Sequence, residues 1–411
     1  MQASPEPLRY DPATRRLNLD PHAPAFVQDP YAAYRFLNAE GGLFFWEDYG
    51  FWCVSSFEAV GRLLRDRRLG RQALPGTRRP GGREHLAGFD AVEAHSLLEL
   101  EPPAHTRLRS LVNRAFVSRQ VERLRPRVES LANALIDGFE KDGAADLLSG
   151  FASPLPITVI AELLGVPPEM GAKMLDWSHA MVVMYMHGAT REAEHAADRA
   201  SRAFDAFIRE QAAQRRRAPG DDLLSTLIAA QEGSQTLSED ELVSSVILLL
   251  NAGHEATVHQ TGNAVRTILQ QGGDPRRFFA SPEATDATVE ECLRFDAPLH
   301  MFKRIAYQPV EIGPQVTLRR GDVVGLMLAA ANRDSRAFEA ADRFDVARPD
   351  QKNLSFGAGI HFCIGAPLAR LELQVALSTL FRRLPQIRLT EPPAYRDSYH
   401  FHGLERLAVA F

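Results

Sequence analysis

Cysteine is scarce in this chain, and its scarcity excludes two kinds of protein. Only three cysteines occur among 411 residues, at the widely spaced positions Cys53, Cys292 and Cys363. Three such residues do not make a disulfide framework, and no CxxC pair or Cys/His cluster supplies the four ligands of a structural zinc site. This cysteine usage fits a reducing compartment.

Long hydrophobic runs and an excess of basic charge are also missing. No stretch reaches the roughly 18 to 20 apolar residues that span a bilayer, and the first residues contain no apolar segment of the secretory type. The net charge of -5 gives no reason to expect nucleic acid or an anionic membrane as a partner. We therefore expect a cytoplasmic protein that binds neither.

No Pro/Gly/Ser-rich linker and no internal repeat divides the sequence. This predicts a single domain over residues 1–411, with residues 1–29 as an N-terminal extension packed on or near it. Residues 69–84, rich in Gly, Pro and Arg, are typical of a surface loop. Helical patterns dominate, at residues 104–116, 120–141, 153–165 and 221–232, and short strands are predicted at 50–55, 310–312 and 323–328. The mixture indicates a mostly α (α+β) fold, helix-rich with small sheets, and not a doubly wound α/β fold.

The clearest predicted element is a helix between Ser238 and Gly272. Ser238 and Glu241 have the spacing of a capping box, and two glycines mark the end. Such a helix has about 32 residues and is about 48 Å long. Its first half is apolar almost all round, which argues for a buried, central position.

Polar residues enter this helix in the stretch AGHEATVH. The motif is not HExxH, because His254 and His259 are five residues apart and therefore about 140° apart around the helix. A zinc-protease site is excluded on that ground. The small residues Ala252 and Gly253 would let a flat group approach the backbone or let the helix bend. Close packing of another helix explains them equally well, and we favour it from these residues alone.

The stretch FGAGIHFCIG, residues 356–365, places Cys363 in a glycine-rich turn. A predicted helix follows directly, and the dipole and free amides at its start favour thiolate over thiol. Phe356 would shield the sulfur from water. A thiolate so placed could be a nucleophile with His361 as its base, or an axial ligand to haem, which needs no further protein ligand. The turn itself depends on Gly357, Gly359 and Gly365.

The same stretch resembles the haem-binding loop of cytochromes P450, FGxGxHxCxG, with every fixed position matched. EECLRF, LNAGHEAT, EPPAHTRLRSLVNRAF and ANRD resemble other family segments in the order that the family requires. The resemblance runs from about Pro30 to the end and is strongest to the soluble bacterial branch. It implies a single-domain cytochrome P450 fold, with the long central helix over haem b (iron protoporphyrin IX) and Cys363 as the proximal ligand of the iron.

The resemblance also implies roles for other residues. His105 and Arg109 share one helix face and would bind a propionate, with Arg304 and His361 as further partners. Glu291 and Arg294 would pair, and Arg348 would complete a structural network behind the haem. The remaining residues expected to contact the cofactor are Ala252, Gly253, Phe356, Gly357 and Gly365.

One position departs from the family pattern. The family usually has an acid followed directly by threonine, whereas here Glu255 is followed by Ala256, and Thr257 comes one residue late. One residue is 100° of rotation, so Thr257 does not simply substitute. Since that threonine orders water for proton delivery, three hypotheses remain: a substrate hydroxyl replaces it, a bend at Gly253 repositions Thr257 or water, or the enzyme uses hydrogen peroxide.

The function implied is a monooxygenase that inserts one oxygen atom of O₂ into a hydrophobic small molecule. Electrons from NAD(P)H would come through a separate ferredoxin and its reductase, docked on arginines such as Arg107, Arg114 and Arg370. The alternatives are a peroxide-driven peroxygenase and a non-catalytic haem-binding protein. We expect a monomer.

The expected substrate pocket draws on residues 69–101 and 177–187. It includes Phe89, Met181, Leu299, Met301, Phe302 and Phe401.

Overall fold

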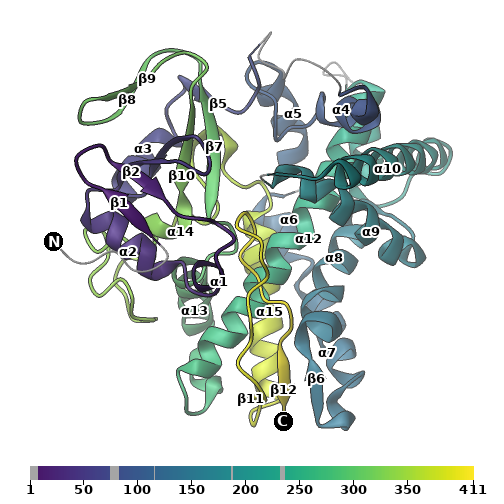
Figure 1. Cartoon of the computed structure of the whole chain (residues 1–411). Coiled ribbons are helices and arrows are strands. Elements are labelled where there is room, and N and C mark those ends of the chain that lie inside the picture. The colour runs from purple at the N-terminus through teal and green to yellow at the C-terminus, as the bar shows by residue number, and fades with distance from the viewer. Residues whose placement is uncertain (1–7, 75–82, 115, 187, 232–236) are drawn as a thin grey trace.

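A computed structural model describes residues 8–74, 83–114, 116–186, 188–231 and 237–411 of the chain. A sheet-rich part and a helix-rich part lie side by side, and the long helix α12 crosses the molecule between them (Figure 1). The mostly α fold with small sheets is confirmed. Within the described residues, every helix is too short or too polar to span a lipid bilayer.

Helix α12 (Glu239–Gln270) has the predicted 32 residues, and the capping box at its start is present. The Ser238 side chain accepts from the Glu241 backbone N–H at 3.1 Å, and the Glu241 carboxylate accepts from the Ser238 N–H at 2.9 Å. Most side chains of α12 are buried, because α8, α9, α10, α13 and α15 all pack against it. The helix is therefore the central element on which the other helices are arranged.

The other helices largely follow the sequence patterns, with one clear difference. The helix expected over residues 120–141 is two helices, because Pro126 falls in the first turn of the second and cannot continue the first. Helix α8 ends as expected at Gly165, which has a φ of 74°. The main helices are α5 (Ala104–Asn113), α6 (Ser118–Glu122), α7 (Arg125–Asp137), α8 (Pro154–Leu164), α9 (Gly171–Val182), α10 (Arg191–Arg217), α11 (Leu223–Gln231), α13 (Pro282–Phe295) and α15 (Ala366–Arg383). Shorter ones are α1 (Pro24–Gln28), α2 (Tyr31–Ala39), α3 (Phe57–Leu63), α4 (Ala87–Glu93) and α14 (Leu328–Ala331).

The three predicted strands exist, and two of them, β4 and β10, are neighbours in one sheet although they are distant in sequence. The seven-stranded sheet has the order β1-β2-β3-β4-β10-β7-β5. In it, β10 pairs parallel with β4 and antiparallel with β7. Its strands are β1 (Arg9–Asp11), β2 (Arg16–Asn18), β3 (Leu43–Trp46), β4 (Phe51–Val54), β5 (Leu69–Gly70), β7 (Met301–Ala306) and β10 (Val323–Met327). Smaller sheets contain β8 (Val310–Gly313) with β9 (Val316–Leu318), and β6 (Ala144–Asp146) with β11 (Arg388–Leu389) and β12 (Ala408–Ala410).

The N-terminal residues that the structure describes are part of this packing. Strand β2 pairs parallel with β3, and Phe26 on α1 is buried. The Phe26 ring stacks on Tyr399 with centroids 5.6 Å apart and meets Trp46 edge-on at 6.1 Å. The segment from residue 8 to residue 29 therefore contributes to an aromatic cluster beside the sheet.

Candidate functional site

The turn around Cys363 is as tight as its glycines suggest. Gly357 and Gly359 have φ values of 70° and 74°. A Cβ on Gly359 would lie only 2.4 Å from the carbonyl oxygen of Leu64, so no other residue fits there. The Cys363 N–H donates to the Phe356 carbonyl at 3.0 Å and closes the loop. Cys363 is thereby fixed three residues before α15, and a Cβ on Gly365 would lie 4.0 Å from its sulfur.

The protein alone does not make Cys363 a thiolate, contrary to the expectation from its place before a helix. Burial raises the pKa of the Cys363 thiol, and this outweighs the backbone N–H groups of Gly365 and Ala366 and the charges of Arg109 and Arg370. A deprotonated sulfur here requires a further positive charge, which a coordinated metal ion supplies.

Two buried side chains near this loop, one guanidinium and one imidazole, lack an anionic partner among the described residues. Arg304 is 3% exposed, and its guanidinium donates to the carbonyl of its neighbour Lys303 at 2.9 Å. Burial lowers the pKa of Arg304 to about 9. His105 is also buried, and its Nε2 has no hydrogen-bond partner among the described residues. Burial and the charges of His361 and Arg109 lower the pKa of His105 to about 4.

His361 and Arg109 border the same place. The rings of His361 and His105 lie 4.5 Å apart, and the Arg109 guanidinium donates to the Phe362 carbonyl at 2.5 Å. His361 Nε2 lies 2.9 Å from a carboxylate oxygen of Glu101. Sequence reasoning missed Glu101, which lies before α5, on the N-terminal side of Pro102 and Pro103.

These residues fit haem, whose two propionates are anionic. A buried guanidinium and a buried imidazole without a protein anion are suited to bind carboxylates. The face of α12 fits a flat ring: Ala252 is exposed and Ala256 half-buried, whereas Asn251 and Glu255 beside them are buried. Since Ala252 and Ala256 are four apart, they share one face of the helix.

Gly253 has a different explanation. A Cβ there would lie 3.0 Å from Cγ1 of Ile160 on α8, so the glycine allows this helix to pack closely. The helix continues without a break through Gly253, and Thr257 remains buried, with its carbonyl accepting from Thr261.

Glu255 is surrounded by imidazoles. His259 Nε2 lies 3.1 Å from its Oε1, and His179 Nε2, from α9, lies 3.2 Å from its Oε2. Burial alone would raise the pKa of Glu255, but the hydrogen bonds from His179 and His259 outweigh it and hold this pKa well below its usual value. No local pattern in the sequence points to His179, because α9 and α12 are far apart along the chain.

A hydrogen-bonded network joins Glu291, Arg294 and Arg348. Arg294 donates to both carboxylate oxygens of Glu291 at 2.7 and 2.8 Å, and Arg348 Nε donates to Glu291 at 3.2 Å. Arg294 also donates to the carbonyls of Asn332 and Ala341, each at 2.9 Å. The network thus ties α13 to the chain that leads to the cysteine.

The six residues expected in a substrate pocket do not all come together. Leu299 and Phe401 face one another across an isolated β-bridge, and Phe302 contacts Gly357 in the cysteine loop. Phe89 and Met181 are buried in the main hydrophobic core. Met301 was expected to line the pocket with Phe302. As the neighbour of Phe302 on β7, however, its side chain points to the opposite side of the sheet, into the cluster with Trp46 and Met327.

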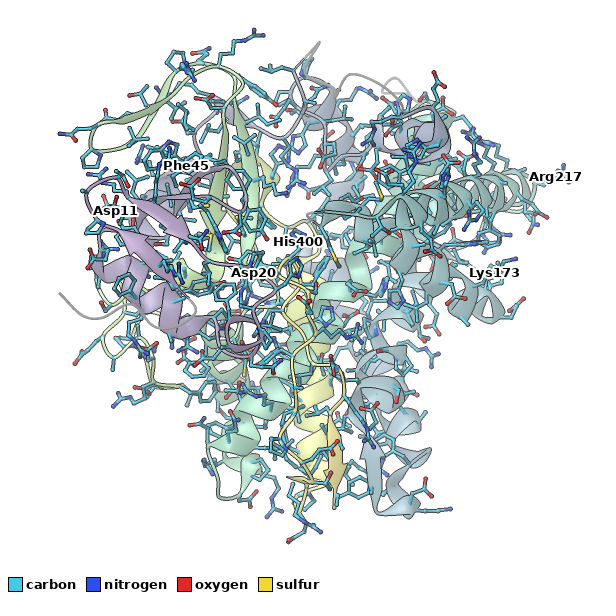
Figure 2. All side chains as sticks on the ribbon, in the orientation of Figure 1. Asp11, Asp20, Phe45, Lys173, Arg217 and His400 are labelled. Carbon is cyan, nitrogen blue, oxygen red and sulfur yellow. The ribbon has the colours of Figure 1, made fainter. Side chains whose placement is uncertain are left out.

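His400, next to Phe401, is a residue that the sequence did not single out. It lies where the sheet-rich and helix-rich parts meet, whereas Lys173 and Arg217 mark the periphery (Figure 2). Burial, together with the charges of Arg71 and Lys303, lowers the pKa of His400 to about 3. Its imidazole is therefore neutral at physiological pH.

Two of the three arginines expected in a docking patch are engaged elsewhere. Arg107 pairs with Glu241, and Arg370 pairs with Glu290 while covering the Phe356 ring at 4.6 Å. Arg114 is exposed.

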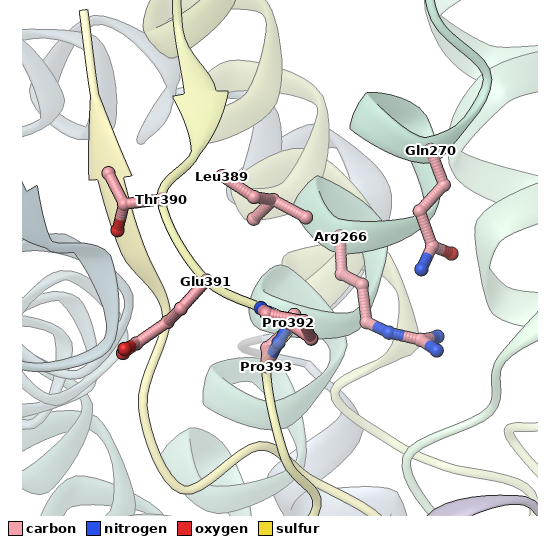
Figure 3. Close-up of a pocket in the computed structure, with 7 residues that line it drawn as sticks. All are labelled: Arg266, Gln270, Leu389, Thr390, Glu391, Pro392 and Pro393. Carbon is pink, nitrogen blue, oxygen red and sulfur yellow. The ribbon is translucent and has the colours of Figure 1, made fainter.

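A separate hollow lies beside the end of α12, lined by Arg266, Gln270 and residues 389–393 (Figure 3). None of the cysteine-loop residues contributes to it, so it is distinct from the site around Cys363.

Comparisons with known proteins agree with this geometry. A family model described as Cytochrome P450 matches residues 280–393. Cytochrome P450 107B1 from Saccharopolyspora erythraea is 39% identical over 370 residues, or 87% of this chain and 88% of that protein. Nocardicin C N-oxygenase from Nocardia uniformis subsp. tsuyamanensis is 42% identical over 351 residues, or 83% and 84%.

A solved cytochrome P450 structure also resembles this fold. P450BioI, in complex with acyl carrier protein carrying hexadec-9Z-enoic acid, has a TM-score of 0.87 and 32% identity to this chain. The match covers 94% of this chain and 99% of P450BioI. The sequence relatives, the superposition and the Cys363 loop lead to one conclusion: the chain belongs to the cytochrome P450 family and is a haem-thiolate monooxygenase.

Proposed function

We propose that this monooxygenase inserts one oxygen atom of O₂ into a hydrophobic small molecule, with NAD(P)H-derived electrons from a separate ferredoxin and reductase. The observation that carries the proposal is the Cys363 turn next to two buried side chains that lack a protein anion, the Arg304 guanidinium and the His105 imidazole. Together they would provide a sulfur ligand for haem iron and polar partners for its propionates.

Haem, when bound, supplies the activation of oxygen. The chain's own residues hold and orient it. Cys363 Sγ would bind the iron, and the propionates would be held by His105, Arg109, Arg304 and His361. Phe356, covered by the Arg370 guanidinium at 4.6 Å, keeps water from the sulfur. Ala252 and Ala256 leave one face of α12 open for the flat ring.

Proton delivery would run through Glu255. His179 is half exposed and therefore exchanges protons with solvent, and its Nε2 lies 3.2 Å from Oε2 of Glu255. Glu255 lies directly before Ala256 on α12, at the edge of the open helix face, and because its pKa is held low it would keep a proton from His179 only briefly before passing it on. Since Ala256 has no hydroxyl to pass it on, a hydroxyl of the substrate or an ordered water would complete the path.

Two observations support the proposed substrate class: the side chains around the site, and the substrates named for similar proteins. Leu299, Phe302 and Phe401 offer an apolar and aromatic surface. The relatives include an N-oxygenase of nocardicin C and a protein solved with a carrier-bound fatty acid. We therefore propose a largely apolar substrate that carries a hydroxyl group, either free or bound to a carrier protein.

A spectral titration of the ferric holoenzyme tests this. Hydrophobic acids, aromatics, terpenoids, steroids and macrolides would be added, each with and without a hydroxyl group. A low-spin to high-spin shift with hydroxylated members, and an oxygenated product with ferredoxin, reductase, NAD(P)H and O₂, are expected. Shifts without any product would favour a non-catalytic haem protein instead.

A peroxygenase is the second candidate, favoured by one observation, Ala256. An enzyme that takes both oxygen and protons from hydrogen peroxide needs no hydroxyl at this position. Product formation with hydrogen peroxide, and none with ferredoxin, reductase and NAD(P)H, would favour the peroxygenase. The opposite result would favour the monooxygenase.

A further inference from the structure

Three potential metal ligands from two helices meet at one carboxylate oxygen. His179 comes from α9, and His254 and Glu255 come from α12. Their ligand atoms all lie within 4.8 Å of one another. Nε2 of His179 lies 3.2 Å from Glu255 Oε2, and Nε2 of His254 lies 3.5 Å from the same oxygen.

His254 is the unusual member of this group. Its side chain is fully buried, and its Nδ1 lies 2.8 Å from the Leu250 carbonyl. A carbonyl only accepts, so Nδ1 carries the hydrogen, and Nε2 of the neutral ring carries a lone pair. This Nε2 has no hydrogen-bond partner among the described residues. Two acceptors, a lone pair and a carboxylate oxygen, therefore face each other in a buried place, where a cation between them would satisfy both.

We propose that His179, His254 and Glu255 bind a divalent transition-metal ion, with Zn²⁺ as the best fit. Imidazole and carboxylate are suitable ligands for zinc, and a tetrahedral ion with bonds of about 2.0–2.1 Å places its ligand atoms roughly 3.3 Å apart. The distances of 3.2 and 3.5 Å bracket this value. The His179 side chain is 51% exposed, so its ring is free to adjust. Water would take the fourth position.

The surroundings support such a site. The Leu250 carbonyl fixes the tautomer of His254, and His259 Nε2, 3.1 Å from the other oxygen of Glu255, orients the carboxylate. Outer partners of this kind are usual around bound metal ions. His254 and His259 still do not ligate one ion together, because His259 occupies the oxygen that faces away from His254.

A zinc ion here would join α9 to α12. It would also occupy the Glu255 oxygen that faces His179, and so block proton exchange between these two residues. This inference goes beyond the proposed function. It shares His179 and Glu255 with the proposed proton path but uses neither Cys363 nor the propionate partners, so metal binding is measured independently of catalysis.

Zinc binding to the holoenzyme tests the proposal. Haem-loaded protein, stripped with a chelator, would be titrated with ZnCl₂ by calorimetry and assayed for metal after gel filtration. One equivalent is expected for the wild type, and His179→Ala should weaken binding at least about tenfold, as even the loss of an outer partner does. His22→Ala is the matched control, because His22 is 56% exposed and pairs with Asp397 at 2.7 Å.

His254→Ala serves as a second variant, provided that its Soret band and circular dichroism match the wild type. X-ray absorption at the zinc edge gives an independent readout, with two imidazoles and no sulfur in the first shell. Absence of binding at about 1 mM zinc, equal binding by wild type and His179→Ala, or a sulfur ligand would each overturn the proposal.

Discussion

Arg294 and Glu291 form two parallel hydrogen bonds, 2.7 and 2.8 Å long, in a place where the two side chains are only 1% and 3% exposed. The pair is therefore a buried ion pair and not a surface one. Three backbone carbonyls, those of Asn332, Ala341 and Arg343, also accept from Arg294, so its charge is fully solvated by the protein.

Glu291→Gln should lower the free energy of unfolding by about 3–5 kcal/mol, because it leaves a buried guanidinium without its counterion. Haem content, measured as the ratio of Soret to protein absorbance, should fall with it. The matched control is Glu162→Gln, which breaks a similar two-bond pair with Arg127 at a more exposed place. That change should cost less than about 1 kcal/mol. Equal effects of the two substitutions would contradict the role given to Glu291.

Gly359→Ala should disrupt the cysteine loop. The φ of 74° alone costs an alanine about 1–2 kcal/mol, and its Cβ would also collide with the Leu64 carbonyl 2.4 Å away. Gly143→Ala has a similar φ of 69° and nothing within 4 Å of the new Cβ, so it isolates the cost of the backbone conformation. Chemical unfolding and haem content of both variants measure the difference. If they behaved alike, the close approach of Leu64 would be irrelevant.

Ala256→Thr should alter the use of oxygen. The new hydroxyl would stand on the open face of α12, directly after Glu255, and supply the group that a substrate hydroxyl otherwise provides. We expect less hydrogen peroxide per NAD(P)H consumed with substrates that lack a hydroxyl. Ala256→Val, equal in shape but without a hydroxyl, is the control. Unchanged peroxide release and turnover in Ala256→Thr would show that the hydroxyl plays no part.

Arg114→Glu should raise the apparent KM for ferredoxin several-fold and leave the spectral titration with substrate unchanged. Arg114 is exposed and caps the C-terminal end of α5, and Arg109 of that helix contacts Phe362 beside Cys363. The two arginines are five residues apart, about 7.5 Å along the helix axis, so the charge of Arg114 adds to the positive field around α5, which would attract an acidic partner. Arg217→Glu, at the far end of α10, makes the same charge change elsewhere (Figure 2). Equal KM values in both variants would remove Arg114 from the docking surface.

The stability of the protein should depend on pH through Glu372 on α15. This carboxyl is buried, neither oxygen has a hydrogen-bond partner among the described residues, and burial raises its pKa to about 8. Between its ordinary value of 4.5 and about 8, the folded protein keeps a proton that the unfolded chain has lost. The free energy of unfolding should therefore fall as pH rises through this window, by up to about 1.4 kcal/mol per pH unit, and level off above it.

Glu372→Gln should flatten this dependence, since a glutamine does not titrate. Urea unfolding between pH 5.5 and 8.5 measures the slopes. Glu129→Gln, whose side chain is half exposed, should leave the wild-type slope unchanged. A slope that persists in Glu372→Gln would assign it to another group.

What could be predicted from the sequence was local. The capping box of α12 involves residues three apart, and the cysteine loop is a continuous stretch of ten, so both are legible without a structure. The break before α7 could also have been predicted from Pro126, although one helix was expected over residues 120–141. The contact between His179 and Glu255 was not, because it depends on how α9 packs on α12. Likewise, the burial that raises the pKa of Cys363 comes from distant segments, and the neighbouring sequence shows only the amides that act against it.

The position of β4 between β3 and β10 has a consequence for synthesis of the chain. Strand β4 lies near the N-terminus, but its parallel neighbour β10 begins only at Val323. While the ribosome makes the residues between them, β4 has one unpaired edge and cannot complete its hydrogen bonds. Contacts of such long range form slowly. The nascent chain therefore leaves one edge of β4 without its parallel neighbour until Val323–Met327 has been made.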